Sequence, residues 1–259
     1  MREKISVCIT AYNEEENIRA CLESVKWADE LIVVDSFSTD STPKICKEYT
    51  DLVYYHRWLG YIEQKNLIRA LASHPWVLFI DADEEVSPQL RDEILKEFDE
   101  GLSRMVNAYE FPRMVRYLGK WIRHGDWYPD IKLRLFRNDL ARCGGMEPHD
   151  RVEVPGPIRR LRGPMYHYTH RDIADHLDSL NKYSSIMAKG WSSAGRKAHP
   201  IQDLMLRPIW SFVRGYFLKA GFLDGVHGLI IAAINAHGVF TKYAKLWALT
   251  HAARLERLK

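Results

Sequence analysis

Apolar runs and helical stretches alternate through the first hundred residues, and this alternation constrains the fold more than any other feature. Four short apolar runs are predicted to be strands: 5–10, 31–34, 52–55 and 76–80. Helices are predicted to follow them, beginning near Asn13, Ser41, Ile62 and Ser87. Since each strand precedes a helix, we expect an α/β fold with a mostly parallel sheet covered by helices on both faces.

Polar clusters follow three of these predicted strands directly. They span 10–14, 35–40 and 81–85. Ligands of parallel sheets bind beyond the carboxyl ends of the strands, so three polar strand ends favour a binding site at that edge. The first cluster lacks a GxGxxG loop, which disfavours a dinucleotide site. The chain also has no GxxxxGK[ST] motif, which excludes a P-loop.

The carboxylates of two clusters have either a ligand-binding role or a structural role. Asp81 and Asp83 supply hard oxygen ligands suited to Mg²⁺ or Mn²⁺, or they form a solvated acidic turn before the next helix. Asp35 accepts hydrogen bonds from a base or a ribose hydroxyl, or it caps its own turn.

Three segments of the first hundred residues resemble motifs of family 2 glycosyltransferases of the GT-A fold. They are ISVCITAYNEEEN at 5–17, VVDSFSTDST at 33–42 and FIDADEE at 79–85, in the family's order and spacing. The resemblance implies a GT-A (nucleotide-diphospho-sugar transferase) domain with a helical extension after it. It also implies a UDP-sugar donor and a Mg²⁺ or Mn²⁺ ion.

The resemblance further assigns donor-site residues. It implies that the first segment lines the nucleoside pocket with Thr10, Ala11, Tyr12, Asn13 and Glu14. Asp35 would hold the uracil, and Lys65 would contact the base or a phosphate. Asp81, Ala82 and Asp83 would bind the diphosphate together with the metal, whose ligands would be the two carboxylates.

Motifs of the second half resemble the bacterial lipopolysaccharide core β-1,4-glucosyltransferase branch of that family. They lie at 127–130, 134–137, 148–152, 167–168 and 207–208. The resemblance implies an inverting transfer, with glucose as the first choice of sugar, to a lipid-linked saccharide acceptor. A carboxylate must then remove the acceptor proton. Asp150 is the first candidate, unless it pairs with Arg151 or Arg134, and Asp130 is the second.

His149 and His167 have several interpretations. Each either orients the base, reaches the metal or has only a structural role. The donor hexose and the acceptor are left open by the sequence.

Charge is distributed unevenly along the chain. Residues 1–150 hold 20 Lys and Arg against 27 Asp and Glu, a net charge of −7, whereas residues 151–259 hold 17 against 7, a net charge of +10. We assign 1–170 to the catalytic domain, with a nucleotide-sugar half at 1–100 and an acceptor half at 101–170. Residues 171–259 are predicted to be a helical region. The basic residues form no nucleic-acid-binding motif.

Aromatic and aliphatic residues fill 209–247 of this helical region. They are predicted to lie on an anionic membrane surface with Arg214, Lys219, Lys242 and Lys245 facing lipid phosphates. The alternative is packing against the catalytic domain or a second subunit, as in a homo-oligomer. The chain shows no signal-peptide pattern and no apolar run of about 18 residues, so we expect a cytoplasmic protein, peripheral on the inner face of the membrane.

Three rival functions have weaker support. A sugar-1-phosphate nucleotidyltransferase would need a glycine-rich basic loop, which 10–14 lacks. An aspartyl phosphohydrolase would carry its carboxylate motif after the first strand, not the fourth. A non-catalytic nucleotide-sugar binding protein would differ only in lacking an acceptor base. The four cysteines contain no CxxC pair, so free thiols are expected.

Overall fold

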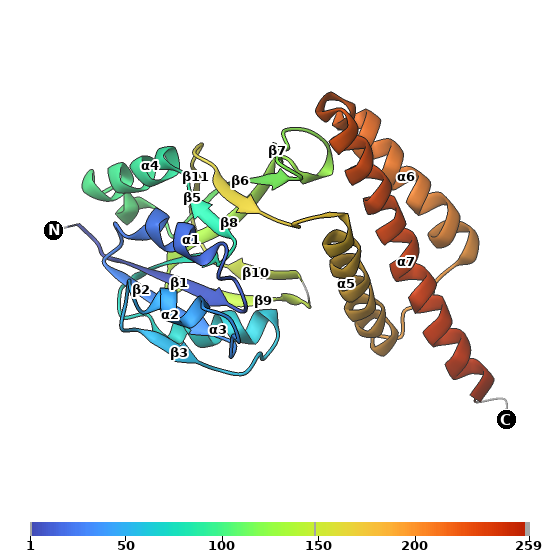
Figure 1. Cartoon of the computed structure of the whole chain (residues 1–259), viewed down its shortest axis with the longest axis horizontal. Coiled ribbons are helices and arrows are strands. Elements are labelled where there is room, and N and C mark those ends of the chain that lie inside the picture. The colour runs from blue at the N-terminus through green and yellow to red at the C-terminus, as the bar shows by residue number, and fades with distance from the viewer. Residues whose placement is uncertain (1, 148, 257–259) are drawn as a thin grey trace. The chain divides into compact units, whose positions relative to one another are not determined.

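The computed structural model describes residues 2–147 and 149–256, without the side chains of 146, 149, 150 and 252–256 (Figure 1). The chain forms two compact units. The first comprises residues 2–114, 130–145 and 149–168, and the second comprises 115–129, 146–147 and 169–256.

The first unit is built on four parallel strands. They are β1 (Ile5–Ala11), β2 (Glu30–Asp35), β3 (Val53–Tyr55) and β4 (Trp76–Asp81), in the order β3-β2-β1-β4. All three neighbouring pairs are parallel. The four predicted strands are therefore confirmed, and the parallel arrangement follows from the helix between each pair.

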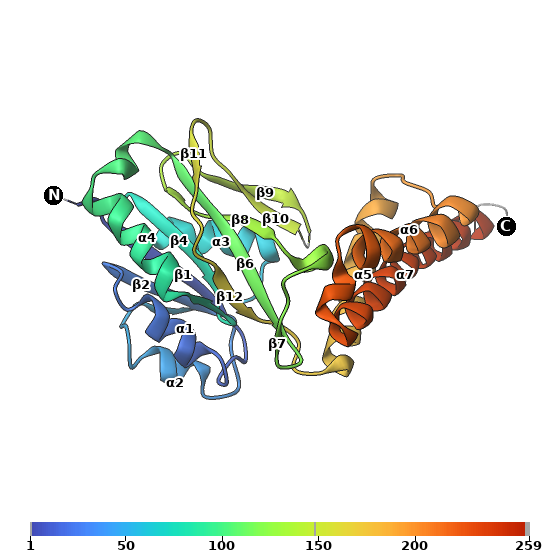
Figure 2. The same ribbon diagram turned by 90° about the horizontal axis from the view of Figure 1, so that it is seen from above.

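Helices cover both faces of these strands, as Figure 2 shows from above. They are α1 (Ile18–Val25), α2 (Thr42–Cys46), α3 (Tyr61–Leu71) and α4 (Pro88–Asp99). Val7 and Ile9 of β1 share a core with apolar residues of α1, α2 and α4, whereas Cys8 faces the core that contains Ile68 of α3. Because successive strand residues alternate between two buried faces, the strands appear in the sequence as continuous apolar runs.

One predicted helix start is wrong. Asn13 does not begin α1, which starts at Ile18. Asn13 instead has a positive φ of 52°, and its Oδ1 accepts a hydrogen bond of 2.8 Å from the Thr39 amide. The side chain that was expected to cap a helix therefore joins two loops. The start at Ser87 is confirmed, because its hydroxyl accepts a hydrogen bond from the Leu90 amide.

Further strands extend the sheet beyond β4. They are β5 (Glu84–Val86), β6 (Ala108–Tyr117), β8 (Asp130–Arg137) and β12 (Met165–Tyr168), in the order β4-β8-β6-β12-β5, with β7 (Lys120–Trp121) and β11 (Ile158–Arg160) also paired to β6. β8 is antiparallel to β4 and to β6, and β12 is antiparallel to β5, whereas β11 is parallel to β6. A separate pair is formed by β9 (Arg142–Met146) and β10 (His149–Glu153). The 3₁₀ helix η1 (Leu102–Met105) precedes β6. The expected mostly parallel sheet thus becomes mixed where the acceptor half begins.

The second unit is helical. Its elements are η2 (Gly125–Trp127), α5 (Ile173–Ser193), η3 (Pro200–Leu206), α6 (Arg207–Val213), η4 (Arg214–Leu218), η5 (Gly221–Asp224) and α7 (Val226–Glu256). Ala188, Tyr243 and Leu246 form a small buried core between α5 and α7. A Cβ atom on Gly228 would lie 1.8 Å from the Gly221 carbonyl oxygen, so α7 begins in direct backbone contact with η5.

Two expectations about the whole chain concern cysteines and membrane spans. The four cysteines are free and buried, as predicted. Within 2–147 and 149–256, no helix has both the length and the apolar character required to cross a membrane.

Candidate active site

Three polar strand ends meet at one edge of the parallel sheet. The strand register pairs Ala11 of β1 with Asp35 of β2, and Thr10 of β1 with Asp81 of β4. The ends of the first, second and fourth strands are therefore neighbours. The predicted convergence is confirmed, and it arises because parallel strands with short connections end at the same level.

The loops after β1 and β2 are joined by hydrogen bonds. The Asn13 amide donates to Ser38 Oγ, and the Glu14 amide donates to Thr42 Oγ1, both at 2.8 Å. Asp35 is fully buried and accepts from the Ser38 amide at 2.8 Å and from the Ser38 hydroxyl at 2.5 Å. Asp35 therefore shapes its own turn, which is one of its two predicted interpretations.

Exposed aromatic rings border these loops. Tyr12 is 58% exposed and Phe37 is 53% exposed. Phe37 has a φ of 63°, in the left-handed region that a bulky residue rarely adopts. Its ring centroid lies 6.1 Å from that of Tyr55. The sequence analysis did not single out Phe37, although an aromatic residue inside a serine-rich turn after a strand was a visible signal.

Asp81 is held between two cations. Its Oδ1 lies 3.6 Å from Lys65 Nζ, and its Oδ2 accepts from Arg134 Nη2 at 2.9 Å. Burial opposes ionisation of Asp81, but the charges of Lys65 and Arg134 outweigh it and hold the pKa of this carboxyl well below its usual range. Lys65 is itself nearly buried, with its ammonium 5.8 Å from the centroid of the Phe79 ring. Lys65 thus lies beside the carboxylates of the site.

Glu84 organises the charges behind Asp81, and the sequence analysis gave it no role. Its side chain is fully buried, and Oε2 accepts from the Asp81 amide at 3.0 Å. Its Oε1 lies 3.1 Å from Arg113 Nη1 and 3.6 Å from Arg134 Nη2. A buried carboxylate requires such partners, because an unpaired charge in the interior is strongly unfavourable.

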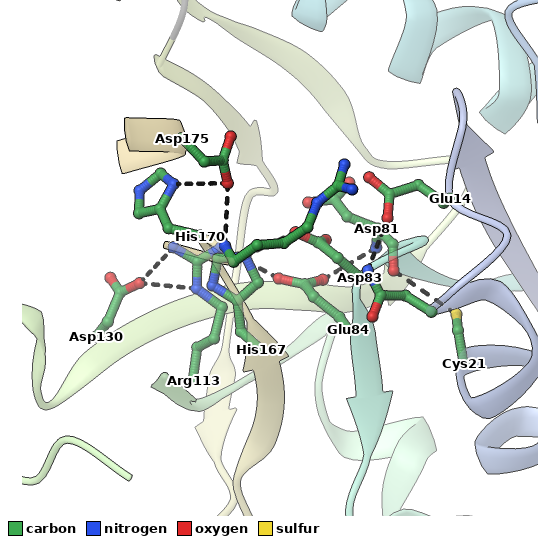
Figure 3. A network of polar contacts seen from close by, with 12 residues as sticks. Glu14, Cys21, Asp81, Asp83, Glu84, Arg113, Asp130, His167, His170 and Asp175 are labelled. Atoms are coloured by element: carbon green, nitrogen blue, oxygen red, sulfur yellow. Dashed lines mark hydrogen bonds and ion pairs between the residues drawn. The ribbon is translucent and has the colours of Figure 1, made fainter. Parts of the chain in front are cut away.

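Asp130, the second candidate base, is ion-paired on both sides. Arg113 Nη2 lies 2.8 Å from Oδ2, and Lys132 Nζ lies 3.0 Å from Oδ1. Figure 3 shows that Arg113 lies between Asp130 and Glu84. The first candidate, Asp150, belongs to β10, but its side chain and that of His149 lie outside the described part of the structure.

Asp83 pairs with His167, as the dashed line in Figure 3 marks. His167 Nε2 lies 3.1 Å from Asp83 Oδ2, and the Asp83 carbonyl accepts from the Tyr168 amide at 2.9 Å. The antiparallel pairing of β12 with β5 places His167 opposite Glu84, next to Asp83. His167 Nδ1 is buried without a hydrogen-bond partner.

Comparison with known proteins identifies the family. Residues 6–149 match the model of Glycosyl transferase family 2. The chain belongs to glycosyl transferase family 2. An uncharacterised glycosyltransferase of Rickettsia typhi is 34% identical over 263 residues, which cover 97% of this chain and 89% of that protein.

One further protein is similar in sequence, and one solved structure is similar in fold. The lipopolysaccharide core biosynthesis glycosyltransferase LpsC of Rhizobium meliloti is 27% identical over 257 residues, which cover 93% of each chain. A crystal structure of glucosyl-3-phosphoglycerate synthase from Mycobacterium tuberculosis with phosphoglyceric acid superimposes with a TM-score of 0.50 at 19% identity. That superposition covers 74% of this chain and 80% of the other. The chain is therefore an enzyme of the glycosyltransferase class with the GT-A fold.

The residues of this glycosyltransferase fit a divalent metal held by few protein ligands. No group of three or more His, Cys, Asp and Glu residues suited to a metal occurs among the side chains described. Mg²⁺ in phosphate-binding sites is held by one or two side chains, with phosphates and water completing its shell. Asp83 meets this description, with His167 Nε2 lying 3.1 Å from its Oδ2, whereas both oxygens of Asp81 lie beside cations.

Proposed function

We propose that this family 2 glycosyltransferase moves a sugar, with glucose as the first choice, from a UDP-sugar to a glycolipid saccharide such as the lipopolysaccharide inner core. The observation that carries the proposal is the meeting of the motifs at 10–14, 35–40 and 81–85 on one sheet edge. The full-length similarity to LpsC, whose name states lipopolysaccharide core biosynthesis, supports the choice of acceptor.

The donor binds at the ends of β1, β2 and β4 in this proposal. Thr10, Ala11, Tyr12, Asn13 and Glu14 line the nucleoside pocket, Asp35 accepts from the uracil, and Lys65 contacts the base or a phosphate. Asp83 would hold the metal, with Asp81 as the second candidate ligand, and these two residues and Ala82 would bind the diphosphate together with the metal. The metal, when bound, neutralises charge on the departing nucleoside diphosphate.

The acceptor is activated by a carboxylate. A carboxylate oxygen takes the proton of the acceptor hydroxyl, and the acceptor oxygen forms a bond to the anomeric carbon from the side opposite the diphosphate. The bond between that carbon and the diphosphate oxygen breaks with its electron pair leaving on UDP, so the configuration inverts. We assign the base to Asp150 first and to Asp130 second. The ion pairs of Asp130 with Arg113 and Lys132 support this order.

The enzyme works at the cytoplasmic face of a membrane in this proposal. The support is the positive charge of residues 151–259 and a set of exposed apolar side chains in the helical unit. The most exposed of these are Ile201, Met205, Leu206, Ile209, Trp210, Phe217, Leu218, Leu223 and Val226. Exposed apolar side chains in such number are typical of an interaction surface.

A donor-hydrolysis screen tests the proposed activity. The full chain is incubated with UDP-, GDP- and ADP-sugars, each with Mg²⁺, Mn²⁺ or EDTA, and the released nucleotide is measured. We expect release from a UDP-sugar that requires the divalent ion. Nucleotide-sugar binding without hydrolysis or transfer to any glycolipid acceptor would favour the non-catalytic alternative, and release only from GDP- or ADP-sugars would contradict the uridine assignment.

A further inference from the structure

Three cationic side chains of the helical unit gather around two aromatic rings. Arg196 follows α5, Arg207 begins α6 and Lys242 lies on α7. Their charged groups lie 5.3, 5.5 and 5.8 Å, respectively, from the centroid of the Tyr243 ring. Arg196 and Lys242 also lie 4.2 and 5.5 Å from the centroid of the Trp191 ring. Three positive charges from separate segments thus lie within about 6 Å of the centroid of one ring, Tyr243.

Carboxylates do not balance this cluster. Arg207 pairs with Asp203 at 2.5 Å, and the second Asp203 oxygen accepts from the His199 amide at 2.8 Å. Arg196 donates to the neutral Tyr243 hydroxyl at 2.8 Å. No carboxylate in the described part of the chain pairs with Arg196 or Lys242. The cluster therefore carries two positive charges in excess.

The excess charge affects the ammonium of Lys242. Burial lowers the pKa of Lys242, and repulsion from Arg196 and Arg207 lowers it further. A bound anion would remove this repulsion. Cation–π contacts alone would explain the packing of the rings, but they do not require three like charges around the one ring of Tyr243.

Three other cations of the helical unit, Arg214, Lys219 and Lys245, have partners. Arg214 and Lys219 both pair with Asp126, each at 3.1 Å. Lys245 donates to backbone and side-chain oxygens of α5, including Ser184 Oγ at 2.8 Å. Lys242 differs from them, because no hydrogen bond or ion pair engages its ammonium in the described structure.

We propose that Arg196, Arg207 and Lys242 form a binding site for a phosphate group. Guanidinium groups bind phosphate oxygens through paired N–H donors, and an ammonium adds a mobile point charge. The Arg207 side chain is 45% exposed, so a ligand can reach the cluster from solvent. The phosphate belongs either to a phospholipid headgroup, which rests on the proposed membrane association, or to a soluble or saccharide phosphate, which does not.

Calorimetric titration with inorganic phosphate tests the site. We expect millimolar binding by the full wild-type chain, at least tenfold weaker binding by Arg196→Gln/Lys242→Gln, and binding within twofold of wild type by Lys197→Gln. Lys197 is the matched control, because it is exposed, adjacent in sequence and outside the cluster. Far-ultraviolet circular dichroism and melting curves verify that each variant is folded.

Vesicle sedimentation separates the two sources of phosphate. Vesicles of phosphatidylcholine alone are compared with vesicles containing 25% phosphatidylglycerol, with and without inorganic phosphate as competitor. Anionic vesicle binding that requires Arg196 and Lys242 assigns the site to a headgroup. Phosphate binding with no preference between vesicles assigns it to a non-membrane phosphate.

Two results would overturn the proposal. One is equal phosphate binding by wild type and the double variant, and the other is wild type that binds neither phosphate nor anionic vesicles. These titrations contain no sugar donor, so their outcome is independent of whether the chain transfers sugar. Vesicle binding that survives the double substitution would assign the membrane association to other residues, and the phosphate of this site to a non-membrane source if the calorimetric binding is lost.

Discussion

Asp35 shapes its own turn, and this local role is compatible with the ligand-binding role that we propose for it. Its carboxylate is fully buried and accepts two hydrogen bonds from Ser38. A carboxylate has about four lone-pair sites, so these bonds leave capacity for a donor such as the N–H of a uracil. The turn geometry therefore positions the group that the proposed function requires.

We predict that Asp35→Ala weakens UDP binding by about 1.5–3 kcal/mol, the loss of a hydrogen bond to a charged group. Calorimetry with UDP measures the affinity. Asp35→Asn keeps one acceptor oxygen and should lie between wild type and Asp35→Ala. Unchanged affinity in Asp35→Ala, with the protein still folded, would limit Asp35 to shaping its turn.

Asp83 is the residue on which the metal assignment depends. We predict that Asp83→Ala folds but loses both its activity and its response to Mg²⁺ or Mn²⁺, because the remaining His167 cannot hold the ion alone. Donor hydrolysis with a metal titration measures both. Asp139→Ala, at an exposed carboxylate outside the strand ends, is the control. Full activity of Asp83→Ala, or of wild type in EDTA, would contradict the assignment.

The two candidate bases differ in what surrounds them, and paired substitutions separate them. We predict that Asp150→Asn lowers transfer by about 10²–10⁴-fold and spares donor binding, because an amide of nearly the same shape cannot take the proton. Asp130→Asn instead removes the negative charge that pairs with Arg113 and Lys132, so it should mainly lower the stability of the fold. Near-normal turnover in Asp150→Asn with an inactive Asp130→Asn would reverse the assignment.

At the scale of elements, the helical unit contains a buried histidine that couples α5 to the end of β6. His176 Nδ1 lies 2.9 Å from the Tyr117 hydroxyl, and its ring stacks on His170 at 4.3 Å between centroids. Burial lowers the pKa of His176 from 6.5 to about 4, with His170 contributing in the same direction. The folded chain thus holds this imidazole neutral.

Acid should therefore destabilise this unit through His176. The unfolded chain takes up the proton near pH 6.5, whereas the folded chain resists it until the pH is near 4. The contribution of His176 to the free energy of unfolding is therefore fully present above pH 6.5, and it falls by about 3 kcal/mol as the pH decreases to 4. Melting curves at several pH values measure the effect. His176→Gln should start less stable at neutral pH but lose less between pH 6.5 and 4. His176→Gln that loses as much stability between pH 6.5 and 4 as wild type would contradict the assignment to His176. So would an equally reduced loss in the exposed control His199→Gln.

At the scale of the whole molecule, the helical unit is the part that we propose to bind the membrane. Three of the basic residues that were expected to face lipid phosphates already have protein partners, because Arg214 and Lys219 pair with Asp126 and Lys245 donates to Ser184 of α5. The attraction to anionic lipid should then depend on the remaining cations and on the exposed apolar side chains.

We predict that the full chain co-sediments with anionic vesicles at low salt and much less at high salt. Exposed charges are screened within about 10 Å at 0.1 M salt, whereas apolar insertion is not weakened by salt. Neutral vesicles are the control. No binding, together with a stable dimer that becomes insoluble when residues 203–259 are deleted, would assign these helices to subunit contacts.

Local patterns in the sequence determined the framework of the first unit. Strands buried on both faces must be apolar throughout, so β1, β2 and β4 were predictable, and their parallel order followed from the helices between them. The same reasoning located the three polar strand ends, because the position of a strand end is a local property. The motif resemblance then named the family before any contact was known.

Only the tertiary structure decided how the charges of the site are paired. Glu84 meets Arg113 and Arg134, and Asp83 meets His167 at a separation of 84 positions, through antiparallel strands that no local pattern aligns. Asn13 failed as a predicted helix start for the same reason, since its conformation is set by the Thr39 amide of another loop. Periodicity reports which face of an element is buried, whereas the partner of a buried charge depends on which distant segment packs against it.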